Sequence, residues 1–182
     1  MPHWTNRPPA AARSSALEII RTPAGRPLTA TIISADITGT ATHFAQNRTL
    51  PCSRPDPCEH CDKGLAWRWH GYLAVLLDGK PRPVILELTA QAAENVAAAR
   101  EQYGTLRSAR IRLTRAGKRP NGRVQVALAP PDPENRHVPP EPDIRVALCH
   151  IWNYDPQRAK PAPRAPNKAA QIHVSPEPPT KN

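Results

Sequence analysis

The sequence predicts a mainly β domain with one helix, in which a metal-binding loop lies between the first two strands. Five short segments are rich in β-branched residues or alternate apolar with polar residues, a pattern typical of strands. One alanine-rich segment between the third and fourth of them has helical spacing. Three of the four cysteines lie close together after the first strand. A chain of 182 residues has room for one such domain with extended ends.

Three strands are predicted before the helix, over residues 28–38, 66–77 and 84–88. Two prolines beside the third strand restrict it to an edge or to a strand start. Alternation along the second strand places Trp67 and Trp69 on its inward, apolar face. The outward face of this strand then carries Arg68, His70 and Tyr72.

The helix is predicted over residues 90–103. Thr89 is suited to the N-cap, apolar residues recur at intervals of three and four, and Gly104 is suited to end the helix. Two more strands follow, over residues 105–115 and 123–129. The basic loop between them ends in an Asn-Gly pair, which favours a hairpin turn.

The domain is expected to span residues 28–130. Residues 1–27 are rich in proline, alanine and arginine and predict an irregular arm. Residues 131–154 predict a proline-rich connector with one extra strand, because residues 143–152 are apolar. Residues 155–182 are basic, proline-rich and without periodicity, which predicts a disordered tail.

The predicted metal-binding loop covers residues 43–64. Cys58 and Cys61 form a C-x2-C pair, which places two thiolates on one metal ion. Cys52 can supply a third sulfur and His43 a nitrogen. Cys3His is a common set of ligands for structural zinc.

Other interpretations of this loop remain open. The fourth ligand could instead be His60 or His70, but His43 is preferred because it closes the loop from the preceding strand. Reduced cysteines without a metal are a further possibility. A disulfide is not expected, because the first residues lack the apolar segment of a secretory signal.

The loop also contains a partial enzyme motif. Residues 57–61 match P-C-x-x-C, half of the signature of zinc nucleobase deaminases. The other half, H-x-E, needs a glutamate two residues after the histidine, and His43 is followed by Phe44 and Ala45. Four protein ligands also leave no position for a reactive water, so the predicted site is structural.

The balance of charge favours an acidic partner. The net charge is +10 and the pI about 10.1. Nucleic acid is the simplest such partner, and an anionic membrane surface is the lesser alternative. No apolar run approaches the length needed to span a membrane. We therefore expect a soluble protein of the reducing cytoplasm.

Residues 104–123 carry seven cations and no acid, which can follow a phosphate backbone. Aromatic side chains near them could stack on bases. A charged strand face is also often merely solvated, and the aromatic residues can equally belong to the core. The residues predicted to bind nucleic acid are Phe44, Arg48, Arg68, Trp69, His70, Tyr72, Arg107, Arg110, Arg112, Arg115, Lys118, Arg119 and Arg123.

The predicted element order resembles the OB-fold, a small five-stranded Greek-key barrel. The resemblance covers residues 28–130. It implies oligonucleotide binding on the second and third strands and by the loops that follow the first and fourth strands. The metal loop and the basic loop at residues 116–122 are these two loops.

A Cys3His zinc module attached to an OB-fold is similar to that of the phage T4-type single-stranded DNA-binding proteins. This resemblance implies that His43, Cys52, Cys58 and Cys61 bind zinc. The ligand spacings differ from those of that family. The basic end of this chain also differs from the acidic tail usual in replicative single-strand binders, so the resemblance is one of architecture.

The resulting expectation is a zinc-stabilised protein that binds single-stranded DNA, or less readily RNA, with little sequence preference. Protein partners are expected through the tails, but no membrane and no small-molecule substrate. The alternative is a non-catalytic adaptor in a nucleic-acid-processing or mobile-element complex. No enzyme is expected, because the chain shows no Ser/His/Asp set, no paired carboxylates in an apolar setting and no phosphate loop.

Overall fold

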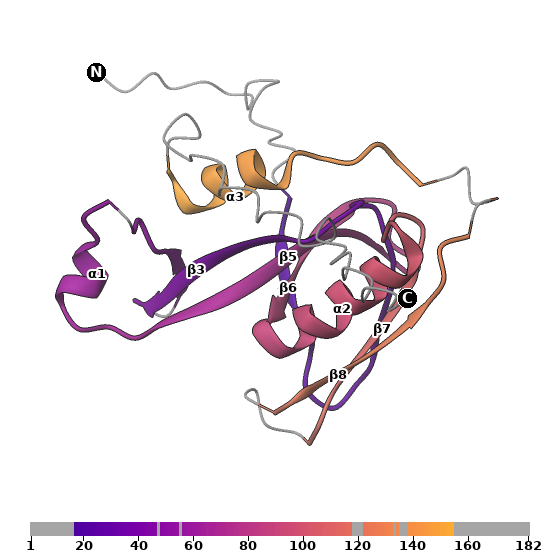
Figure 1. Cartoon of the computed structure of the whole chain (residues 1–182), viewed down its shortest axis with the longest axis horizontal. Coiled ribbons are helices and arrows are strands. Elements are labelled where there is room, and N and C mark those ends of the chain that lie inside the picture. The colour runs from indigo at the N-terminus through magenta and orange to yellow at the C-terminus, as the bar shows by residue number, and fades with distance from the viewer. Residues whose placement is uncertain are drawn as a thin grey trace, which may run out of the picture.

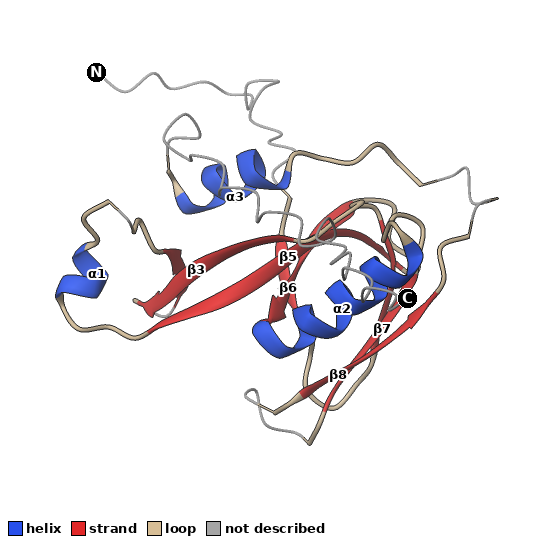
Figure 2. Ribbon diagram, in the orientation of Figure 1, coloured by secondary structure: helices blue, strands red, loops and turns tan. Residues whose placement is uncertain are grey.

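The computed structural model describes residues 17–46, 48–54, 56–117, 122–132, 134 and 138–154. This part of the chain is mainly β, with an open, mixed sheet and three helices (Figure 2). The strands are β1 (Ile19–Arg21), β2 (Leu28–Ile32), β3 (Thr38–Ala45), β4 (Arg48–Pro51), β5 (Trp67–Leu77), β6 (Pro83–Thr89), β7 (Arg110–Arg115) and β8 (Val124–Ala129). The helices are α1 (Glu59–Asp62), α2 (Ala90–Tyr103) and α3 (Ile144–Trp152).

The sheet has the order β1-β6-β5-β2-β7-β8, and β3 and β4 extend it beside β5. All pairings are antiparallel except that of β1 with β6 and an isolated bridge from Ala24 to Arg115. No pairing between described residues joins β8 to β6, so the sheet does not close into a barrel there.

The first predicted strand, over residues 28–38, is in fact two strands. β2 ends at Ile32 because the next two residues both bond to Ala74. The Ile33 N–H donates to the Ala74 carbonyl at 2.8 Å, while the Ala74 N–H donates to the Ser34 hydroxyl at 2.7 Å. Two residues facing one interrupt the ladder and bend the strand. β2 therefore pairs with the end of β5, and β3 with its beginning.

Helix α2 has the predicted bounds and covers one face of the sheet. The Thr89 hydroxyl accepts the Ala92 N–H, and Gly104 takes the left-handed conformation at the other end. Ala92, Ala93 and Val96 pack into the main core against apolar residues of β2, β5, β6, β7 and β8. The predicted fourth strand begins only at Arg110, because the preceding residues form a turn.

Helix α3 corrects the prediction of an extra strand in residues 131–154. Its N-cap is Asp143, which accepts the Val146 N–H at 3.0 Å, and Asn153 ends it in the left-handed conformation. Ile144 and Leu148, four residues apart, point together into a second core. A short apolar run is compatible with either a strand or a helix, and here the capping residues at both ends favour the helix.

The second core lies on the face of the sheet opposite to α2. It joins α3 to Tyr72, Ala74 and Ile85, and Leu17 and Ile19 pack against it. The N-terminal segment, residues 1–27, is thus not irregular throughout, because β1 pairs with β6. β1 and α3 therefore pack against the sheet, although both lie outside the expected limits of the domain, residues 28 and 130.

The first half of β5 runs with β3 away from the main core, and α1 lies at its far end (Figure 1). We call residues 38–46, 48–54 and 56–70 the arm. Directly paired residues of antiparallel strands share a face. One face, called the metal face, carries Gly39, Ala41, His43, Trp67, Trp69 and Gly71. The other, called the back face, carries Thr40, Thr42, Phe44, Arg68 and His70.

Candidate metal centre

Four potential metal ligands meet at the metal face of the arm. His43 lies in β3, Cys52 directly follows β4, Cys58 precedes α1, and Cys61 lies within it. The β3–β4 pairing continues into Cys52, whose N–H donates to the Ala41 carbonyl at 2.9 Å. The single turn of α1 then brings the two cysteines of the C-x2-C pair to one side. Local structure therefore assembles the whole set.

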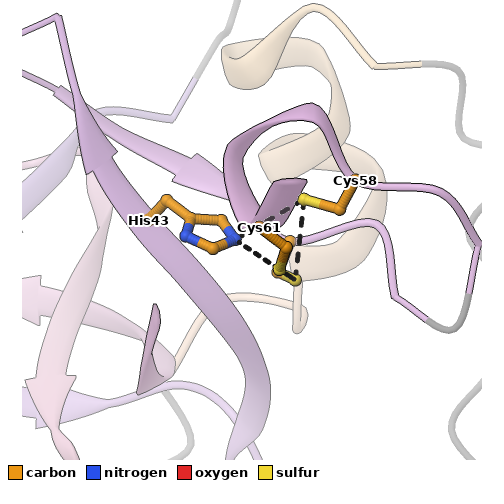
Figure 3. Close-up of side chains that lie close together, drawn as sticks. His43, Cys58 and Cys61 are labelled. Carbon is orange, nitrogen blue, oxygen red and sulfur yellow. Dashed lines mark hydrogen bonds between the residues drawn. The ribbon is translucent and has the colours of Figure 1, made fainter. Parts of the chain in front are cut away.

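The distances within the set suit a tetrahedral metal ion. Cys52 Sγ lies 3.8 Å from Cys58 Sγ and 3.6 Å from Cys61 Sγ. His43 Nε2 lies 3.5 Å from Cys58 Sγ and 3.4 Å from Cys61 Sγ (Figure 3). Tetrahedral zinc, with bonds of about 2.3 Å to sulfur and about 2.0 Å to nitrogen, separates two sulfurs by about 3.8 Å and sulfur from nitrogen by about 3.5 Å. The four residues can thus hold a metal ion together.

The cysteines of the cluster are not joined as disulfides. All three are free, and the two sulfur–sulfur distances given above far exceed the bond length of about 2.05 Å. The fourth described cysteine, Cys149, lies in α3, away from the cluster.

The histidine of the cluster is oriented by the backbone. His43 is 1% exposed, and its Nδ1 lies 3.3 Å from the Ala66 carbonyl. Donation from Nδ1 to this carbonyl leaves Nε2 with a free lone pair directed at the sulfurs, as metal ligation requires. Of the two other candidates, His60 places its ring centroid 5.5 Å from that of His43 and is not part of the cluster, and His70 bonds to Thr42 instead.

The protein environment shifts the pKa values of two of the thiols in opposite directions. Burial alone would raise the pKa of Cys58, but hydrogen bonds from the Cys61 and Ser53 N–H groups lower it to about 5. Burial, with the neighbouring thiols, raises the pKa of Cys61 to about 11. Of these two thiols, Cys58 therefore ionises at the lower pH, and a bound cation would favour the thiolate form of Cys61.

Tyr72, predicted to be exposed and to contact nucleic acid, is buried. Its exposed fraction is 0%, and its ring meets the edge of Trp152 of α3 with centroids 5.7 Å apart. Its hydroxyl donates to Glu87 Oε2 at 3.4 Å. The alternation along β5 was read correctly, but α3 covers the face that was expected to be open. Tyr72 therefore cannot reach a ligand.

Three predicted phosphate ligands are engaged within the fold. Arg107 donates to the carbonyls of Ile33, Val138 and Pro139 at 2.7–2.9 Å. Arg115 donates to the carbonyls of Thr22 and Gly122. Arg110 forms a two-pronged pair with Asp78, with both distances 2.7 Å, and this pairing lowers the pKa of Asp78. The hydrogen bonds of these three arginines therefore link strands to the segments that connect them.

The other predicted nucleic-acid ligands are more accessible. Phe44, Arg48, Arg68 and Trp69 are exposed on the arm, and Arg112 and Arg123 at β7 and β8. These four arginines have no ion pair among the described residues. His70 is half-buried, which lowers its pKa, and bonds to the Thr42 hydroxyl at 2.7 Å. Lys118 and Arg119 lie outside the described residues.

One exposed aromatic residue lies on the face that the alternation predicted to be inward, and it was not among the predicted nucleic-acid ligands. Trp67 is 58% exposed, although it shares a face with Leu73 and Val75. Those residues pack against α2, whereas Trp67 lies beyond the end of the main core. Gly39 and Gly71 face each other beside the tryptophans. A glycine within a strand often marks a place where another group approaches the backbone closely, so these two could have indicated that a tryptophan ring lies there.

No helix in the described ranges combines the length and apolar character that crossing a membrane requires. The chain matches no protein-family model, and neither a curated protein nor a solved structure matches it.

Proposed function

We propose that the protein binds single-stranded nucleic acid stoichiometrically, without catalysis and with little sequence preference. The observation that carries this proposal is the composition of the arm. Exposed aromatic rings and unpaired arginines lie on the same short structure that the Cys3His cluster holds together. Rings supply stacking that does not depend on base identity, and arginines bind phosphates.

Zinc is the metal proposed for the cluster. A tetrahedral set of three sulfurs and one imidazole is typical of zinc. His43, Cys52, Cys58 and Cys61 would hold it, and the ion would fix the shape of a segment that has little apolar core of its own. Four protein ligands leave no coordination position for a substrate, so its role is structural.

The proposal includes an OB-type architecture. The strands β7, β2, β5 and β6 lie side by side in the sheet. With β3 and β4 assigned to the arm, they are the fourth, first, second and third strands of the proposed barrel, which is the Greek-key order. α2 stands between the third and the fourth, and the OB-fold is itself a partly open Greek-key barrel. In this scheme the arm is the loop between the first two strands.

The arm is the preferred binding surface within that scheme. An OB-fold also binds on its second and third strands, here β5 and β6. One face of this pair packs on α2 and the other on α3, so its middle is covered on both sides. The exposed arm, together with Arg112 of β7 and Arg123, which directly precedes β8, then supplies the open contacts.

Fluorescence anisotropy with a labelled single-stranded 30-mer, matched RNA and duplex DNA, over a series of salt concentrations, tests the proposal. We expect tighter binding of single strands than duplex, DNA above RNA, and a steep loss of affinity as salt increases. Equal affinity for duplex, or binding that salt does not change, would contradict it. A protein that captured other proteins but no oligonucleotide would favour the adaptor function. A cytoplasmic setting, which suits the free thiols, is part of the same proposal.

A further inference from the structure

Two tryptophans lie next to each other on the metal face of the arm. Trp67 pairs with His43 and Trp69 with Ala41, so both side chains leave β5 on the same side as the metal ligands. Their exposed fractions are 58% and 37%. An exposed pair of this kind needs an explanation, because large aromatic side chains usually contribute their area to a core.

The position of Trp69 depends on two glycines that face each other. A Cβ added to Gly39 would lie 1.9 Å from Cζ2 of the indole, and one added to Gly71 would lie 3.2 Å from Cη2. The ring therefore rests against the backbone of both strands, in space that any other residue at Gly39 would fill. The backbone supports one side of the ring while part of it stays exposed to solvent.

The metal cluster and α2 border this surface. His43 lies directly across from Trp67, and Cys52 bonds to Ala41, the residue across from Trp69. Toward the main core, Ala93 of α2 lies near Gly71. The tryptophans therefore lie between the loop that carries the potential metal ligands and a helix. We call Trp67, Trp69, Gly39 and Ala41 the tryptophan platform.

We infer that the tryptophan platform is where unpaired bases stack, one on each indole, an inference that rests on the proposed function. Residues two apart in a strand are separated by about 6.6 Å. Stacked bases in a duplex strand are only about 3.4 Å apart. Neighbouring bases can reach both rings only if they are drawn apart, which a single strand allows and a duplex does not. The platform thus gives a geometric reason for preferring single strands.

The charges around the platform suit a phosphate backbone. Arg48 pairs with Ala45, which places its side chain on the metal face, and it is exposed without an ion pair among the described residues. Arg54 of the metal loop is also exposed and close enough to lower the pKa of Cys61. Lys63, a further cation of the arm, is already paired with Glu59. An apolar peptide would gain nothing from the two arginines, so a polyanion with aromatic bases is the better fit.

The back face offers a matched control. Phe44 is 61% exposed on the same arm but points away from the platform. We expect Trp67→Ala to weaken binding of a single-stranded oligonucleotide about tenfold, as loss of one stacked base requires. Phe44 was predicted from the sequence to bind nucleic acid, but it lies on the opposite face and is not part of the platform, so Phe44→Ala should change the affinity less than twofold. Trp67→Phe should recover most of the loss, and an abasic strand should bind wild type and Trp67→Ala alike.

Each result is decisive. If Phe44→Ala weakens binding and Trp67→Ala does not, the bases lie on the back face and the platform is wrong, while the proposed function stands. If the abasic strand shows the same loss as the normal one, Trp67 contributes no stacking. If wild type binds no single strand at all, the proposed function and the platform fail together. Metal content and circular dichroism of each variant confirm that a loss does not arise from unfolding.

Discussion

At the scale of single residues, Gly39 is a position where one added methyl group has a large expected effect. The Trp69 ring fills the space of a Cβ there, while the backbone of Gly39 has no positive φ that would itself exclude alanine. Gly39→Ala must therefore move the ring or the strand, at a cost of about 1–3 kcal/mol. Urea unfolding measures this loss. In a Trp69→Ala background the same substitution should cost much less, and simple additivity of the two changes would contradict the contact.

Tyr72 gives a prediction about alkaline pH. Burial, and then the nearby carboxylate of Glu87, raise the pKa of Tyr72 above its ordinary value. The neutral phenol is thus favoured in the folded state. It contributes stability that is complete below the unfolded pKa of about 10 and declines as the pH rises above it. The free energy of unfolding should fall by up to about 1.4 kcal/mol more per pH unit in wild type than in Tyr72→Phe. Parallel curves for the two proteins above pH 10 would contradict this.

At the scale of elements, the arm is expected to depend on its metal and the main core is not. Most arm residues are exposed, whereas the main core lies among β2, β5, β6, α2, β7 and β8. Chelation, or Cys58→Ser, should remove about one metal ion per chain and abolish amide protection in residues 38–46 and 56–70. Protection in α2 should persist. Hydrogen exchange with mass spectrometry, beside a metal assay, measures both effects.

Cys149→Ser is the matched control for that experiment, because Cys149 lies in α3 and outside the cluster. It should retain the metal. Affinity for the metal should also fall as the pH falls, since protons compete for thiolates and imidazole. A chain that kept its metal after loss of Cys58, or an arm that stayed protected without metal, would show that the cluster does not hold the arm.

The elements that the sequence predicted well are those whose signals are local. α2 has its cap, its stripe and its terminal glycine within one segment, and its bounds agree with the prediction. The four residues that can hold a metal ion also lie within a short stretch, and the sequence indicated that they would come together. α3 was missed because its apolar run is short and its helical state depends on the capping Asp143 and on packing against β5 and β6.

The exposed residues were harder to predict, because exposure is decided by distant segments. The alternation along β5 gave the two faces correctly, but α3, more than seventy residues later in the chain, covers Tyr72. In the same way, nothing near Arg107 in sequence indicates that its partners are the carbonyls of Ile33, Val138 and Pro139. A run of cations predicts a charged surface only where the fold leaves those side chains unpaired.

At the scale of the whole molecule, the difference between cations that are paired within the fold and cations that are unpaired determines the expected salt dependence. The net charge of +10 attracts a polyanion from a distance, but only arginines that are free to contact phosphates release counterions on binding. Arg48 and Arg112 are exposed and without an ion pair among the described residues, whereas Arg110 is held by Asp78. The first two should therefore contribute to the slope of log affinity against log salt, and Arg110 should not.

Binding of a single-stranded oligonucleotide by charge variants, measured at several salt concentrations, tests this expectation. Arg48→Ala and Arg112→Ala should each make the slope shallower by about 0.7, the value for one phosphate contact on a single strand. Removing Asp78 and Arg110 together leaves the net charge unchanged and should leave the slope unchanged as well. If the double variant flattened the slope as much as Arg48→Ala did, the Asp78–Arg110 pair would have to open on binding. The phosphate path would then extend along the outer face of β7 from Arg112 to Arg110.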